Sequence, residues 1–130
     1  MKQKIAGILI LAAMGLPMFA HHSFDAEYDR SKSREFVGTV TKVEWMNPHA
    51  RFYMDVKEAD GKVVKWEFEL GSPNGLMRSG WTRNSIKVGD VIKCRGSLAK
   101  DGSALANASA LTLANGTVVG AASSGENAKQ

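Results

Sequence analysis

Cysteine is nearly absent from this chain of 130 residues, since Cys94 is the only one. An intramolecular disulfide is therefore excluded, and a domain this small must rely on one well-packed core. Cys94 alternates with Ile92 along residues 91–95, while Lys93 and Arg95 take the opposite face, and this pattern predicts a buried core position. A reactive or intermolecular thiol is the alternative.

Catalytic signatures are missing as well. The sequence has no Gly-x-Ser-x-Gly, no phosphate-binding loop, no Cys–His pairing and no internal repeat. Glu67 and Glu69 share a strand face, as an acid–base pair does, but they alternate with Lys65 in the manner of a solvated surface. We therefore expect no enzyme activity and no catalytic residue; a hydrolase with Glu67 or Glu69 as its base is the alternative.

Long hydrophobic runs are confined to the start of the chain. Lys2 and Lys4 precede an apolar run over residues 5–19, and the small residue Ala20 follows. This three-part pattern is typical of a secretory signal peptide over residues 1–20. A transmembrane anchor is the alternative, but the run is shorter than the ~20 residues that a spanning helix needs. We expect no membrane span after cleavage.

A strong excess of charge is also lacking. Cleavage after Ala20 would remove Lys2 and Lys4, which lowers the formal net charge from +4 to +2. The remaining charges of both signs are interspersed, so they form no basic footprint for nucleic acid. Together with the signal peptide, this predicts a periplasmic or secreted protein that does not bind nucleic acid.

What remains is a succession of short strands separated by turn residues. Residues 21–33 form an N-terminal arm, or an extra strand that turns at residues 29–32 and runs back along the next strand. Strands are predicted near residues 34–45, 51–56, 64–70, 91–97 and 104–113, with a short helix after Ser72 and Pro73 and a flexible tail over 115–130. Gly38 marks a bulge or a sharp bend in the first of these strands, which serves both edges of the sheet.

The order of these elements predicts the fold. Three strands, a short helix and two further strands are the topology of the oligonucleotide/oligosaccharide-binding (OB) fold, a five-stranded barrel. We therefore predict an all-β, OB-like barrel over residues 34–114.

Several motifs resemble a family of small exported bacterial proteins of unknown function. They are His21-His-Ser-Phe24, Gly38-Thr-Val-Thr-Lys-Val-Glu-Trp45, Asn47-Pro-His49, Gly80-Trp81, Lys87-Val-Gly-Asp90 and Ala99-Lys-Asp-Gly-Ser103. The resemblance spans most of the chain after the signal peptide. It implies export and a compact β domain, and it transfers no catalytic residue.

All three histidines fall in two short segments, His21 and His22 at the predicted mature terminus and His49 in a turn. After cleavage the α-amine and imidazole of His21 form a chelating pair, which a nitrogen of His22 or His49 would complete. Such a set of nitrogen donors suits Cu(II). Alternatively, His22 alone supports a local chelate through the amine, a backbone amide and its imidazole.

Two considerations oppose a metal site that includes all three histidines. Terminal residues are often disordered, and His49 can simply hydrogen-bond across its turn. If Tyr28 faces Ser33 in a hairpin, the strand positions of His21 and His49 lie about 17 Å apart, at ~3.3 Å per residue.

A binding face without metal is the second hypothesis. Trp45, Asn47, Arg51 and Tyr53 lie on or beside the first two strands, on the face with which OB folds bind oligonucleotides and sugars. Core packing is an alternative role for Trp45. This second hypothesis predicts an adaptor for a periplasmic protein, peptide or glycan.

Overall fold

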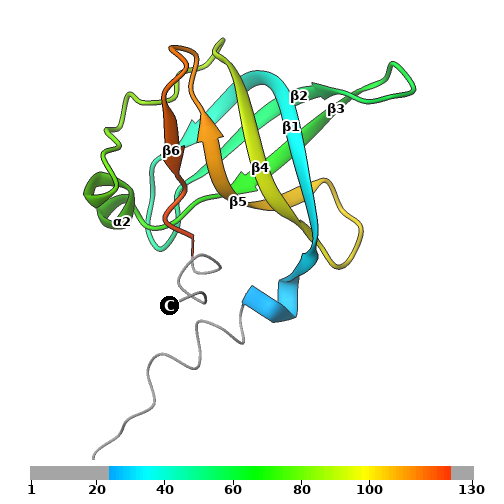
Figure 1. The fold of residues 1–130 in the computed structure, drawn as a ribbon, viewed down its shortest axis with the longest axis horizontal. Helices are drawn as coiled ribbons and strands as arrows, with labels where there is room; N and C mark the ends of the chain where they lie inside the picture. Colours follow the sequence, from blue (N-terminus) through cyan, green and yellow to red (C-terminus); the bar gives the residue numbers. More distant parts are fainter. Residues whose placement is uncertain (1–23, 124–130) are drawn as a thin grey trace, which may run out of the picture.

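The computed structural model describes residues 24–123, which form a helical turn, six strands and a short helix (Figure 1). The helical turn covers residues 24–27. The other elements are β1 (Tyr28–Glu44), β2 (Arg51–Lys57), β3 (Val63–Glu69), α2 (Pro73–Arg78), β4 (Val91–Ala99), β5 (Leu105–Thr112) and β6 (Val118–Gly120). The largely antiparallel sheet confirms the all-β prediction. Over the described residues, no helix has both the length and the apolar character to cross a membrane.

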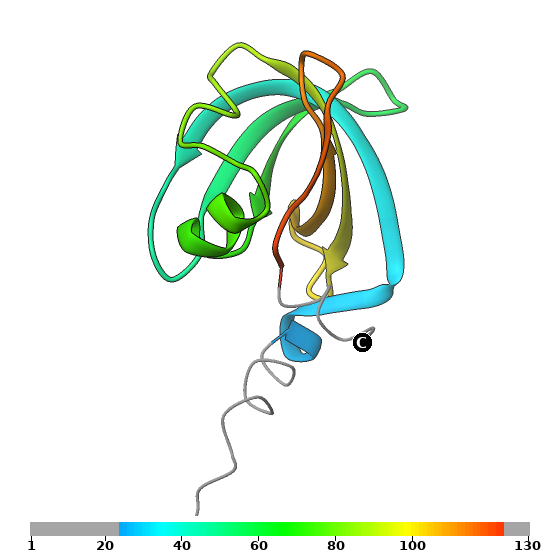
Figure 2. The same ribbon diagram turned by 60° about the vertical axis from the view of Figure 1, so that its left-hand side comes forward.

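The strands close into a ring. They follow the order β3-β2-β1-β4-β5-β6, and a short parallel pairing of Glu67–Glu69 with Leu105–Asn107 joins β3 to β5. The ring therefore runs β1-β2-β3-β5-β4 and returns to β1, and the sheet curls accordingly in both ribbon views (Figures 1 and 2). Strand β6 pairs only with β5, outside the ring.

Strand β1 makes closure possible because it serves two neighbours. Its first part pairs with β4 and its last part with β2, and Gly38 and Thr39 pair with both strands. This confirms the prediction of a long strand that serves both edges. The register shift lies between Val40 and Lys42, so the β1–β2 bulge is at Thr41 and not at Gly38. At Gly38 the neighbouring backbone comes so close that a Cβ would lie 2.4 Å from the Asp55 carbonyl oxygen.

Alternating side chains fill the ring. Phe36, Phe52 and Phe68 are almost fully buried, and the rings of Phe52 and Phe68 stack with centroids 4.8 Å apart. Cys94 lies among them, which confirms its predicted core position, and burial raises the pKa of its thiol. Leu76, from α2, packs against the same core.

Helix α2 begins as its sequence predicts. Pro73 stands at the start of the helix, and the Ser72 hydroxyl caps it by accepting a hydrogen bond from the Gly75 amide at 3.1 Å. Helix α2 and Trp81 lie between β3 and β4 in sequence. Leu76 and Trp81 belong to the core, and the Trp81 indole donates a hydrogen bond to the Gly120 carbonyl of β6 at 2.7 Å.

The first strand departs from the prediction at its start. The chain does not reverse at residues 29–32, because Tyr28 pairs with Ala99 on β4 instead of Ser33. Asp29 does form local turn contacts, since its Oδ1 accepts hydrogen bonds from the backbone and hydroxyl of Ser31. The polar run therefore produces a register shift between Asp29 and Ser33 within a continuing strand.

The end of the fold also differs from the prediction of a flexible tail over residues 115–130. Val118–Gly120 form β6, and Ala121 and Ser123 are buried. The Ala121 carbonyl accepts a hydrogen bond from the Gly71 amide at 2.8 Å, which holds this segment against the loop that precedes α2. The sequence did not predict this packing, because the small side chains of the segment carry little apolar surface. Residues 124–130 lie outside the described range.

A Gly38→Ala substitution tests the close approach in β1. The added methyl group would meet the Asp55 carbonyl, so the strands must separate locally, and we expect a loss of about 1–3 kcal/mol in the free energy of unfolding. Urea denaturation measures this loss. Thr39→Ala, at the next and exposed position, is the control. Equal stability of the two variants would contradict a steric limit at Gly38.

Candidate functional site

The outer face of β2 and β3 carries a row of polar side chains. Because strand residues alternate, Phe52 and Phe68 point into the ring while Arg51 and Glu69 point out. The register places Arg51 opposite Glu69, and Tyr53 opposite Glu67. Arg51 and Glu69 carry opposite charges, and such a cross-strand pair stabilises the pairing of β2 with β3.

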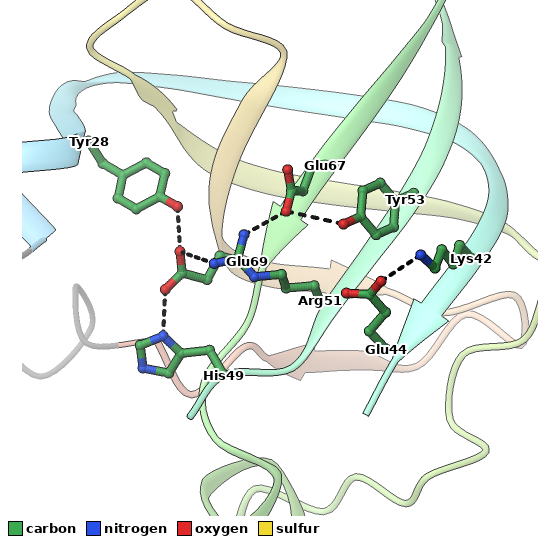
Figure 3. Close-up of polar contacts among 8 residues, drawn as sticks. All are labelled: Tyr28, Lys42, Glu44, His49, Arg51, Tyr53, Glu67 and Glu69. Carbon is green, nitrogen blue, oxygen red and sulfur yellow. Dashed lines mark hydrogen bonds and ion pairs between the residues drawn. The ribbon is translucent and has the colours of Figure 1, made fainter. Parts of the chain in front are cut away.

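Glu69 is the buried member of this row, with 7% of its surface exposed. A carboxylate in such a position needs several donors. The Tyr28 hydroxyl donates to its Oε2 at 2.5 Å, and His49 Nδ1 lies 2.6 Å from its Oε1 (Figure 3). Arg51 Nη2 lies 3.7 Å from Oε2 and completes the set. Glu69 thus joins the start of β1 to the turn between β1 and β2.

Arg51 extends the network along the strand. Its Nη1 donates to Glu67 at 2.5 Å, and the Tyr53 hydroxyl donates to the same carboxylate oxygen at 3.3 Å (Figure 3). Partial burial lowers the pKa of Arg51, but the hydrogen bond to Glu67 and the charge of Glu69 outweigh it, so the pKa rises. Partial burial and the charge of Glu67 also raise the pKa of Tyr53.

Glu69 contributes to the raised pKa values of two neighbouring side chains, Tyr28 and Glu27. Burial raises the pKa of Tyr28 far above its ordinary value of 10.0, and the hydrogen bond to Glu69 adds to the shift. Partial burial and the charge of Glu69 raise the pKa of Glu27 as well. Phe24 packs on Tyr28 with ring centroids 5.3 Å apart and, with Ala99, encloses this corner.

His49 is the half-exposed member, with 40% of its side chain accessible. Its Nδ1 faces Glu69, and within the described part of the chain Nε2 makes no hydrogen bond or ion pair. Neutral imidazole nitrogens are common metal ligands, so the lone pair of Nε2 is available to bind a metal ion. Over residues 24–123, however, no group of three or more His, Cys, Asp or Glu side chains is placed to hold a metal by itself.

The structure gathers some of the predicted site residues and separates others. Arg51 and Tyr53 meet at Glu67, and Arg51 and His49 meet at Glu69. Trp45 is half-buried and packs on the core, while Asn47 is exposed in the turn. His21 and His22 lie outside the described residues.

Three residues of the site escaped sequence analysis. Glu67 and Glu69 appeared to belong to a solvated face, and Tyr28 to a hairpin or an arm. The Asp60-Gly61 turn would have revealed part of the network, because it sets the register that places Glu69 opposite Arg51. No local pattern would have placed Tyr28 over β3, since this contact spans 41 residues.

The fold and the site together define a small all-β domain in which a buried carboxylate ties the first strand to the following turn. The chain belongs to a family of unknown function, DUF6152, whose family model matches residues 9–108. The resemblance to an uncharacterised family is confirmed to that extent. No curated protein matches the chain, and no solved structure matches it.

A Tyr28→Phe substitution tests the contact with Glu69. It removes a hydrogen bond to a charged group, so we expect a loss of about 1.5–3 kcal/mol in the free energy of unfolding at neutral pH. Because folding raises the pKa of Tyr28, its contribution is complete below pH 10.0 and is lost as the pH rises above that value. Urea denaturation from pH 7 to pH 11 follows both effects.

Tyr53→Phe is the matched control, because its hydroxyl makes a longer contact with the less buried Glu67. We expect a smaller loss from this variant. A difference between wild type and Tyr28→Phe that stays constant up to pH 11 would contradict the assigned role of the phenol.

Proposed function

We propose that this protein is exported and binds copper on an OB-like β-barrel, with His49 and the histidines of the mature terminus as ligands and without catalysing a reaction. The closed ring supports the barrel, since its strand order and the helix between β3 and β4 are those of the OB fold. Strand β6 is an addition to that pattern. Export rests on the signal-peptide pattern of residues 1–20.

The observation that carries the copper proposal is the pairing of His49 with Glu69. A carboxylate that holds one imidazole nitrogen leaves the other available to a metal, and this arrangement is widespread around metal-binding histidines. His49 has this arrangement, with Nδ1 on Glu69 and a half-exposed ring. Imidazole suits copper among several ions, and an amine completes a nitrogen set that favours Cu(II).

The path of β1 weakens the main geometric objection to a shared site. Tyr28 and His49 touch opposite oxygens of one carboxylate, so the start of β1 lies beside the turn instead of a sheet length away (Figure 3). Residues 24–27 form a single helical turn before Tyr28. His21 precedes Phe24 by three residues, and three residues span at most about 10 Å.

An adaptor function on the face around Arg51 and Tyr53 has weaker support. Both side chains contact Glu67, so a peptide or glycan that binds there must compete with an existing ion pair. Trp45 packs on the core and offers only part of its surface for stacking.

Copper titration of the exported protein tests the proposal. Intact mass first establishes the mature start, which we expect at His21. Three chains are then compared by Cu(II) affinity and electron paramagnetic resonance: the mature protein, His49→Ala, and a chain that starts at Ser23. We expect His49→Ala to bind at least about tenfold more weakly, with a changed nitrogen hyperfine pattern, because one ligand is lost.

The chain that starts at Ser23 controls for the terminal ligands and keeps the described domain. We expect it to lose high-affinity binding. If His49→Ala retains the affinity and the spectrum of the wild type, His49 is not a ligand and the terminal segment binds copper alone. If no chain binds copper, the proposal is wrong and the adaptor hypothesis gains.

A further inference from the structure

We infer that Glu69 is a positioning residue that fixes the His49 ring with its proton on Nδ1, so that Nε2 faces outward as the only nitrogen able to accept a metal ion. The inference deepens the proposed function and rests on it for the identity of the ion. The ring orientation itself rests on contacts within the described chain.

The first step concerns the proton. Nδ1 of His49 and Oε1 of Glu69 are 2.6 Å apart. A carboxylate oxygen and an unprotonated ring nitrogen are both acceptors, so a contact this short requires a proton between them. The neutral ring then carries its hydrogen on Nδ1, and the lone pair is on Nε2.

The second step concerns rigidity. Glu69 cannot swing away from His49, because its other oxygen accepts the Tyr28 hydroxyl and lies near Arg51. Its side chain is only 9% exposed, whereas that of His49 is 40% exposed. The carboxylate is thus the fixed partner and the imidazole the adjustable one. A ligand held in this way loses little orientational freedom when the ion binds.

The third step concerns specificity within the row. Glu67 lies two residues away on the same strand and face and forms an ion pair with the same arginine, but among the described residues it makes no hydrogen bond or ion pair with His49. The strand therefore carries two glutamates on the same face, and only Glu69 bonds to the histidine. This makes Glu67 a matched control for Glu69.

The test begins with the metal-free protein. Long-range ¹⁵N–¹H nuclear magnetic resonance at pH ~9, above the ordinary titration range of imidazole, identifies the tautomer of each histidine. His49→Ala assigns the His49 signals. We expect the Nδ1–H tautomer for His49 in the wild type, unlike the side chain of free histidine, which favours Nε2–H. An Nε2–H tautomer in the wild type overturns the inference without any Glu69 variant.

Glu69→Ala and Glu67→Ala are then compared. We expect Glu69→Ala to shift His49 toward Nε2–H and to weaken Cu(II) binding about 10–100-fold, with Glu67→Ala close to wild type in both. Glu69→Leu removes the acceptor but keeps most of the side-chain bulk, and it serves if the alanine variant does not fold. An unchanged tautomer in the folded Glu69 variant, or an equal change in Glu67→Ala, overturns the inference.

The two hypotheses fail separately. If the tautomer follows Glu69 but wild type binds no Cu(II), the proposed function is wrong and the positioning of His49 remains correct. If wild type binds Cu(II) through His49 and the affinity is unchanged in Glu69→Ala, the proposed function stands and the role of Glu69 is wrong.

Discussion

A buried carboxylate on the outside of the sheet is the constraint around which this domain is arranged. Glu69 is removed from water, so its charge requires donors, and three segments supply them: the start of β1, the β1–β2 turn and β2. None of these donors is a sequence neighbour of Glu69. The carboxylate therefore fixes where the first strand lies as well as how His49 is turned.

The closed ring is the second constraint, and it depends on the length of β1. A strand of 17 residues that pairs first with β4 and then with β2 must coil tightly where it changes partner. Gly38 allows the neighbouring backbone to come close, and the bulge at Thr41 shifts the register between β1 and β2. The sequence predicted either a bulge or a sharp bend at Gly38. Closure then brings β3 beside β5, and Glu69 lies at that junction, opposite Asn107.

Local patterns predicted the parts of this fold that local chemistry decides. Alternation along residues 51–56 and 64–70 identified the inward side chains, and Ser72 with Pro73 marked the helix start. The errors lie where tertiary contacts override local signals. Asp29 and Ser31 have the composition of a turn, yet pairing with β4 keeps the strand continuous. Glu69 alternates like a surface residue, but it is buried and bonded to Tyr28, which lies 41 residues away in sequence. His49 was identified from its rarity, but its partner was not.

The pairing of Tyr28 with Ala99 has a consequence for the order of folding. These residues are separated by 71 positions, so the start of β1 has no partner strand until most of the chain is available. Hairpins such as β2–β3 close over a few residues and form early. We therefore expect the corner around Glu69 to be among the last parts of the domain to assemble.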